Sequence, residues 1–166
     1  VGLVDGQPRM QAQLKHTSGA IIATDGGFLP SSIKTQGLLV STDATLVLLP
    51  WDQDVANVVV GSGSTGFNNG LGTAAQIDNP KGFGVWQSGV SLIMTDRSNN
   101  CIRRISTNYD VTTLTGVPGT SALVDGTLSQ ARFKNPRALT MKVGTQIAYV
   151  GEKDGEIRKI TSSAVS

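Results

Sequence analysis

Residues 91–116 read SLIMTDRSNNCIRRISTNYDVTTLTG, and this stretch decides the fold. Residues 90–95, 101–106 and 111–115 are short runs of mainly apolar and β-branched residues, which strands prefer. The runs are separated by residues 97–100 and 107–110, whose Asn and Ser side chains bond to their own backbone in turns. The stretch therefore predicts three consecutive antiparallel strands, and residues 84–86 add a fourth ahead of them.

The rest of the chain contains further copies of this unit. Leu-Val-Asp-Gly occurs at residues 3–6 and at 123–126, and Phe-Asn-Asn-Gly holds the equivalent place at 67–70. A second marker occurs at 12–19, 75–82 and 131–138, where the last two copies share Ala, Asn and Pro in the same register. A third marker is Ile-Arg-Arg-Ile at 102–105 and Ile-Arg-Lys-Ile at 157–160. Three markers in one order indicate an internal repeat, with units at about 3–61, 66–116 and 122–166.

Repeated units of four short strands are typical of a β-propeller, which protects strand edges by radial packing. The sequence therefore predicts an all-β fold of less than about 10% helix, an arc of three four-stranded antiparallel blades in a single domain. We expect Leu14, Ile77 and Phe133 to be buried at equivalent positions. The last blade is expected to lack its outer strand, because residues 161–166 stop where that strand would begin.

Unit 2 resembles an NHL repeat. That family's pattern places an Asp, an Asn three residues later, Ile-Arg-Lys-Ile, and then Val-Thr-Thr-Leu-Ala-Gly, which compares with residues 95–105 and 111–116 here. The resemblance covers residues 66–161, whereas unit 1 has Leu-Val-Leu-Leu at 46–49, and Gly151 stands where unit 2 has Asp96. It implies a propeller, typically of six blades, in a family of mostly binding scaffolds with a minority of enzymes and RNA binders. The expected structural repeat residues are Asp96, Asn99, Arg103, Arg104, Arg158 and Lys159.

The distribution of charge favours structural over nucleic-acid-binding roles. The chain of 166 residues has a net charge of +2. We expect the basic doublets at 103–104 and 158–159 to pack their stems between blades and to pair with carboxylates such as Asp96. The loops between second and third strands and those leading into the next unit share one face, here called the upper face. Its charges nearly balance, so nucleic acid is a disfavoured partner. Its candidate binding residues are Arg97, Arg132, Lys134 and Arg137.

Unit 1 also carries an insertion. Gly19 and Leu39 are 20 positions apart, whereas Gly82 and Ile93 are 11 apart. The extra residues lie near 25–32 and are expected on the lower, opposite face. They place Phe28 and Leu29 there as candidate binding residues, unless these two fold back to cap the blade.

Catalytic chemistry has little support in the sequence. His16 is the only histidine, and zinc catalysis needs about three protein ligands. Cys101 is the only cysteine and begins a strand, so we expect a buried, inert thiol. Asp52 and Asp54 alone provide too few oxygens for calcium, which takes about six to eight. No catalytic, cofactor-binding or metal-binding residue is therefore named, and no cofactor is expected.

The sequence favours a non-enzymatic protein-interaction or scaffold module. The alternative is a hydrolase-like or lyase-like propeller enzyme whose site is completed outside this chain, and an RNA-binding module is less favoured. An open arc has exposed strand edges, so the expected partner is a protein, the remainder of a larger propeller chain or assembly, or a second copy. The start inside a loop favours the larger chain or assembly over the homodimer. No apolar run reaches about 18 residues, so no membrane segment is expected, and the compartment is not indicated.

Overall fold

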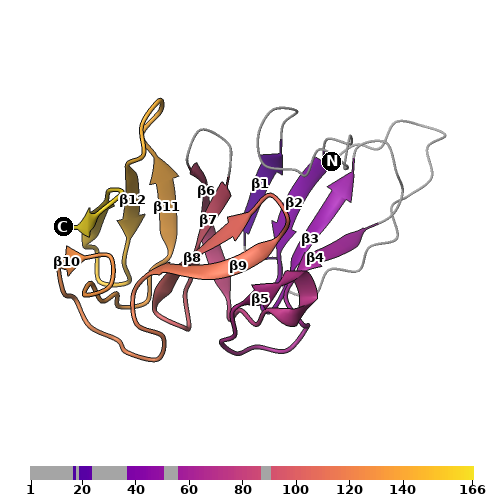
Figure 1. The fold of residues 1–166 in the computed structure, drawn as a ribbon, viewed down its shortest axis with the longest axis horizontal. Helices are drawn as coiled ribbons and strands as arrows, with labels where there is room; N and C mark the ends of the chain where they lie inside the picture. The colour runs from indigo at the N-terminus through magenta and orange to yellow at the C-terminus, as the bar shows by residue number, and fades with distance from the viewer. Residues whose placement is uncertain (1–16, 18, 24–36, 51–55, 87–90) are drawn as a thin grey trace.

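A computed structural model describes residue 17 and residues 19–23, 37–50, 56–86 and 91–166. These residues form three antiparallel sheets that stand side by side (Figure 1). Among them the only helix is the three-residue 3₁₀ turn η1 (Gly72–Ala74). The expected all-β class is thus confirmed, and no helix in the described part of the chain is long and apolar enough to span a membrane.

The first sheet is a plain meander in the order β1-β2-β3-β4. Its strands are β1 (Gly19–Ala23), β2 (Gly37–Ser41), β3 (Leu46–Pro50) and β4 (Asn57–Val60). The apolar run 46–49 is its third strand, and Leu46 and Leu48 on it are buried. Thr42 shapes the turn before β3, because its hydroxyl accepts a hydrogen bond from Thr45 N at 3.1 Å.

The second sheet has five strands in the order β5-β9-β8-β7-β6. They are β5 (Gly70–Leu71), β6 (Pro80–Trp86), β7 (Ser91–Asp96), β8 (Cys101–Ser106) and β9 (Asp110–Thr115). Strands β6 to β9 are the expected meander. Strand β5 comes from the segment that leads into the unit, and it pairs with the outer strand β9 through Gly70 and Val111.

The third sheet has the order β10-β14-β13-β12-β11, and it corrects one expectation. Its strands are β10 (Gly126–Thr127), β11 (Ala138–Met141), β12 (Ala148–Gly151), β13 (Ile157–Ile160) and β14 (Ala164–Val165). The prediction that this unit lacks its outer strand, leaving β13 as an open edge, is wrong. The Thr161 hydroxyl accepts a hydrogen bond from Ala164 N at 3.1 Å and turns the chain back. The returning segment then pairs with β13 through Ile160 and Val165.

Neighbouring sheets touch at backbone level through glycine on their first strands. A Cβ built on Gly19 would lie 2.3 Å from Lys81 O, and one built on Gly82 would lie 2.4 Å from Leu139 N. Any side chain at these positions would push the backbones apart. Glycine therefore sets the close spacing of β1, β6 and β11, and the third equivalent position holds Ala138.

The core fills the spaces between sheets in two clusters. The cluster between the first and second sheets includes Leu39, Leu48, Ile77, Leu92, Met94 and Ile105. The cluster between the second and third sheets includes Trp86, Ile93, Ile102, Phe133, Val150 and Ile160. Ile77 and Phe133 are both fully buried, as predicted, whereas Leu14 lies outside the described residues. The second sheet thus buries both of its faces.

Candidate functional site

The second sheet contains a fully buried ion pair. The register pairs Met94 with Arg103, so Asp96 lies two positions along on the same face of the sheet. Arg103 Nη1 donates to Asp96 Oδ2 at 2.9 Å, and neither side chain is exposed. Asp96 also accepts hydrogen bonds at 2.9 Å from Asn99 Nδ2 and from Asp78 N. Three predicted repeat residues, Asp96, Asn99 and Arg103, thus form one hydrogen-bonded group.

Arg103 holds the segment that leads into the unit. Its Nη1 donates to Gln76 O at 3.2 Å, and its Nη2 donates to Asn68 O and Asn69 Oδ1, each at 2.9 Å. Its Cζ lies 4.5 Å from the centre of the Phe67 ring, within the range of a cation–π contact. One guanidinium therefore fixes the backbone between residues 67 and 76 against the sheet.

Arg158 repeats this arrangement in the third sheet. Its Nη1 donates to Arg132 O and to Glu152 Oε1, both at 3.0 Å, and its Nη2 donates to Val124 O at 2.9 Å. Asp125 Oδ1 lies 2.5 Å from the same Nη2. The buried acidic partner is Glu152, whose other oxygen accepts a hydrogen bond from Lys134 N. The two arginines and the segments they hold are here called the arginine clamps.

Burial has the largest effect on the pKa of the acidic residue in both clamps. It raises the pKa of the Asp96 carboxyl, while the hydrogen bonds from Asn99 and Asp78 and the charge of Arg103 oppose that rise. It also raises the pKa of Glu152, against the hydrogen bond from Lys134 and the charge of Arg158. Removing charges from water thus costs more than the partners return, as expected for buried ion pairs.

The second residue of each doublet behaves differently from the clamp arginine. Arg104 is half-buried and donates from Nε to Ser91 Oγ at 3.2 Å. Lys159 is exposed, and its backbone pairs with Ser166 at the end of the chain. Since successive residues of a strand point to opposite faces, neither side chain can join the clamp.

On the upper face, two predicted binding residues come together. Arg97, in the turn after β7, and Arg137, just before β11, line a hollow of about 290 Å³ together with Lys81. Lys81 was not among the predicted residues. The signal was present, because Lys81 and Arg137 each follow an Asn-Pro pair at the same place in the repeat.

The other two predicted upper-face residues lie apart from this hollow. Arg132 turns back on its own segment, where its Nη1 donates to Ala131 O at 2.9 Å. Lys134 Nζ lies 2.6 Å from Asp154 Oδ2 in an exposed ion pair. This pair lowers the pKa of Asp154 and raises the pKa of Lys134. Phe28 and Leu29 lie outside the described residues.

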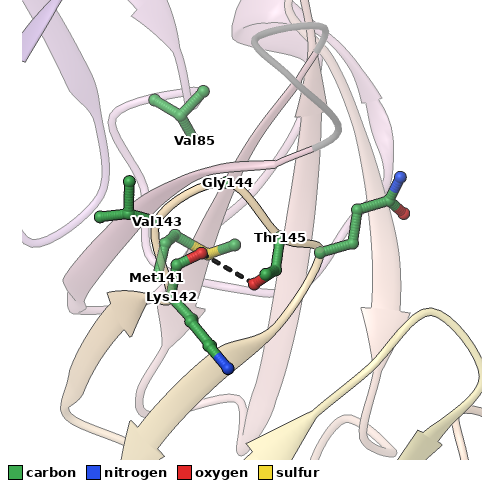
Figure 2. Close-up of a pocket in the computed structure, with 7 residues that line it drawn as sticks. Val85, Met141, Lys142, Val143, Gly144 and Thr145 are labelled. Carbon is green, nitrogen blue, oxygen red and sulfur yellow. Dashed lines mark hydrogen bonds between the residues drawn. The ribbon is translucent and has the colours of Figure 1, made fainter.

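A second hollow, of about 530 Å³, lies at the opposite end of the strands (Figure 2). The turn after β11 forms most of its wall, and Val85 from β6 completes it. Thr145 Oγ1 donates to Lys142 O at 2.8 Å and closes that turn, while Val143 at its tip is 96% exposed. Figure 2 shows apolar side chains, Val85, Met141 and Val143, beside the polar Lys142 and Thr145 around this space.

The described residues contain no cluster of three or more His, Cys, Asp or Glu side chains arranged to hold a metal ion. Cys101 is fully buried, and burial raises the pKa of its thiol far above the ordinary value. A thiol in this state is a weak nucleophile. His16, Asp52 and Asp54 lie outside the described residues.

Comparison with known proteins supports the fold and leaves the family open. No protein-family model and no curated protein match the sequence. An auxiliary nutrient binding protein from Bacteroides thetaiotaomicron VPI-5482 matches with 20% identity and a TM-score of 0.67, over 84% of this chain and 36% of its own. An auxiliary nutrient binding protein from Bacteroides ovatus ATCC 8483 matches with 20% identity and a TM-score of 0.67, over 78% and 34%.

A putative phosphatase from Bacteroides thetaiotaomicron VPI-5482 matches with 19% identity and a TM-score of 0.66, over 89% of this chain and 34% of its own. The chain thus spans about a third of the length of these structures. At such identities the likeness concerns the fold alone. It defines the class of this protein as an all-β, propeller-like fold.

Proposed function

We propose that this chain is a non-enzymatic interaction module: an NHL-type propeller segment, with blades at 3–61, 66–116 and 122–166, that is completed by further sheets. The observation that carries the proposal is the open face of the third sheet. On that face Tyr149 is 37% exposed and Ile157 is 74% exposed. In a complete propeller of, typically, six blades, a following blade covers this face.

Comparison of the second and third units gives the reason to expect a further sheet on the open face of the third sheet. In the second sheet Thr95 pairs with Ile102, and in the third Gly151 pairs with Ile157, so Tyr149 corresponds to Ile93. Ile93 and Ile102 are fully buried in the cluster between the second and third sheets. Covering an isoleucine stabilises a protein by roughly 1.5–3 kcal/mol, which favours a further sheet on the equivalent face.

The arginine clamps support a scaffold role. They use buried charge to fix the segments at 67–76 and 124–134, so the loops that follow are held rigidly for binding. The names of the two nutrient binding proteins support a binding role for the same fold. We place the protein partner on the upper face, with Arg97, Arg132, Lys134 and Arg137 as contact residues, and retain Phe28 and Leu29 as further candidates.

A pair of substitutions in the intact protein tests the covered face. Ile157→Lys would place a charge between two sheets, so we expect it to lower the free energy of unfolding by roughly 1–3 kcal/mol. Val143→Lys is the matched control, because Val143 is almost wholly exposed at a turn and should tolerate lysine. Equal stability of the two variants would refute the covered face. A photoreactive residue at 157 should also cross-link to a neighbouring sheet, and one at 143 should not.

An enzyme completed outside this chain is the second candidate, and the likeness to a putative phosphatase favours it. Metal analysis and activity assays of the intact protein separate the two proposals. A stoichiometric metal required for turnover would support the enzyme. Cross-linking of a discrete protein through a photoreactive residue at position 132, abolished by competing unlabelled protein, would support the interaction module.

A further inference from the structure

We propose that Lys81, Arg97 and Arg137 bind the phosphate dianion of a small molecule, in the hollow of the upper face. This inference does not depend on the proposed function, since a small-ligand site serves a scaffold and an enzyme equally. It rests on the convergence of three cationic side chains from three separate segments on one space of about 290 Å³.

The backbone beneath the site is firmly held. Thr95 Oγ1 accepts a hydrogen bond from Gly82 N at 2.8 Å and donates to Arg137 O at 3.0 Å, which joins β6 to the start of β11. Arg137 N also donates to Gly151 O at 2.8 Å. The positions of Lys81 and Arg137 are thus fixed across the junction of two sheets. Such preorganisation lowers the entropic cost of binding.

The side chain of Arg97 is also held in place by hydrogen bonds. Its Nε donates to Asn135 Oδ1 at 2.6 Å, and Asn135 N donates to Asn100 Oδ1 at 2.8 Å. Asn135 itself has a φ of 57°, in the left-handed region that asparagine tolerates. This chain of contacts uses Nε, while the two Nη atoms of Arg97 make no hydrogen bond to any residue that the structure describes. Two parallel Nη donors suit the oxygens of a phosphate.

The charges around the hollow favour a dianion over a monoanion. No carboxylate is among the described residues that line it. Asp154 interacts with the charge of Arg137, but it already pairs with Lys134 at 2.6 Å. Three cations in one hollow repel each other, and a counter-ion relieves that repulsion. Phosphate provides two charges and up to four oxygens, whereas a carboxylate provides one charge and two oxygens.

Titration calorimetry of the intact protein tests the site, with inorganic phosphate, glycerol phosphate and acetate as probes. We expect saturable phosphate binding with Kd of about 1 mM or tighter, and much weaker binding of acetate. Arg97→Ala, Arg137→Ala and Lys81→Ala should each weaken phosphate binding about tenfold. Tighter binding of glycerol phosphate than of inorganic phosphate would identify an organic phosphate as the ligand, and the reverse would identify the free ion.

The control variant is Lys142→Ala, which removes an exposed cation at the opposite end of the strands and should leave phosphate binding unchanged. Circular dichroism and thermal unfolding establish that each variant is folded. The proposal is overturned if phosphate shows no saturable binding, if acetate binds equally well, or if Lys142→Ala weakens binding as much as Arg97→Ala. Binding of a single-stranded oligonucleotide without binding of either small phosphate would also overturn it, in favour of a nucleic-acid surface.

Discussion

Glu152 serves Arg158 as Asp96 serves Arg103, because each acid lies two positions beyond the residue that pairs with its arginine, Val150 in the third sheet and Met94 in the second. The distances between the bonded nitrogen and oxygen are 3.0 Å and 2.9 Å. The prediction that Gly151 takes the place of Asp96 is wrong, because Gly151 pairs with Ile157 as Thr95 pairs with Ile102, so Glu152 takes the place of Asp96. The turn between acid and arginine is one residue shorter in the third unit, since Glu152 and Arg158 are 6 positions apart and Asp96 and Arg103 are 7, and the pair is preserved.

The length of the Glu152 side chain is a testable requirement, because its two oxygens accept hydrogen bonds from Arg158 and from Lys134 N. Glu152→Asp withdraws the carboxylate from both Arg158 and Lys134 N, so we expect the free energy of unfolding to fall by roughly 1–3 kcal/mol. Urea unfolding of the variant measures this loss. Glu156→Asp is the matched control, because Glu156 is exposed and should tolerate the shorter side chain. Similar losses in the two variants would contradict the assigned role of Glu152.

Removing Arg103, the clamp arginine of the second sheet, should lower the free energy of unfolding more than Glu152→Asp does. Arg103→Ala leaves Asp96 buried without its partner and frees the backbone of residues 67–76, so we expect a loss of about 3–5 kcal/mol. Arg104→Ala, at the half-buried neighbour, should cost less. Differential scanning calorimetry compares the two variants. An unchanged melting temperature for Arg103→Ala, together with lost binding of a partner or RNA, would instead assign Arg103 to a binding surface.

The buried carboxylates also predict a particular response to acid. Burial raises the pKa of Asp96 above 3.8 and that of Glu152 above 4.5, their ordinary values. In the pH window just above those values the folded chain binds more protons than the unfolded chain. The contribution of these groups to the free energy of unfolding therefore increases as the pH falls through the window, and decreases as the pH rises.

Urea unfolding at about pH 7 and about pH 5 measures this response, since both values lie near or above the ordinary range of carboxyl pKa. Asp96→Asn removes the titrating group. The wild-type protein should therefore gain stability relative to Asp96→Asn as the pH is lowered. A loss of stability relative to this variant over the same interval would show that the pKa of Asp96 is lowered by its partners.

Sheet spacing gives a fourth prediction. Gly82→Ala would place a Cβ 2.4 Å from Leu139 N, against backbone that cannot move aside. We expect a loss of roughly 1–3 kcal/mol or more, as for other overpacked cores. Gly151→Ala is the control, since its Cβ would meet only the Ala138 side chain at 3.5 Å, an ordinary contact. Chemical denaturation of both variants makes the comparison, and equal stability would show that the sheets can separate without cost.

The repeat markers predicted the main strands because each marker combines a turn with an apolar run. Strands β5, β10 and β14 were missed, since each has two residues and such short strands carry no alternating pattern. They form because the arginine clamps and the Thr161 turn bring distant segments together. Contacts between distant segments of this kind produce no periodic pattern in the sequence.

The candidate site was predictable only in part. Arg97 and Arg137 were recognised as basic loop residues on one face, and the hollow brings them together. Lys81 was not selected, although it follows an Asn-Pro pair as Arg137 does, because this shared position does not show by itself that the two side chains line one hollow. Glu152 was missed because aligning the units on the Ile-Arg marker sets Gly151 opposite Asp96, whereas the turn after Glu152 is one residue shorter than the turn after Asp96.

The pairing of Gly70 with Val111 has a consequence for how the chain is made. The two residues are separated by 41 positions, so β5 leaves the ribosome well before its partner strand β9 exists. At roughly 5–20 residues per second, the segment waits roughly 2–8 s before it can dock. During that time the backbone of β5 lacks the partner strand with which it pairs, and an unpaired strand can pair with other nascent chains. Translation speed across residues 70–111 therefore sets how long each new copy is vulnerable to aggregation.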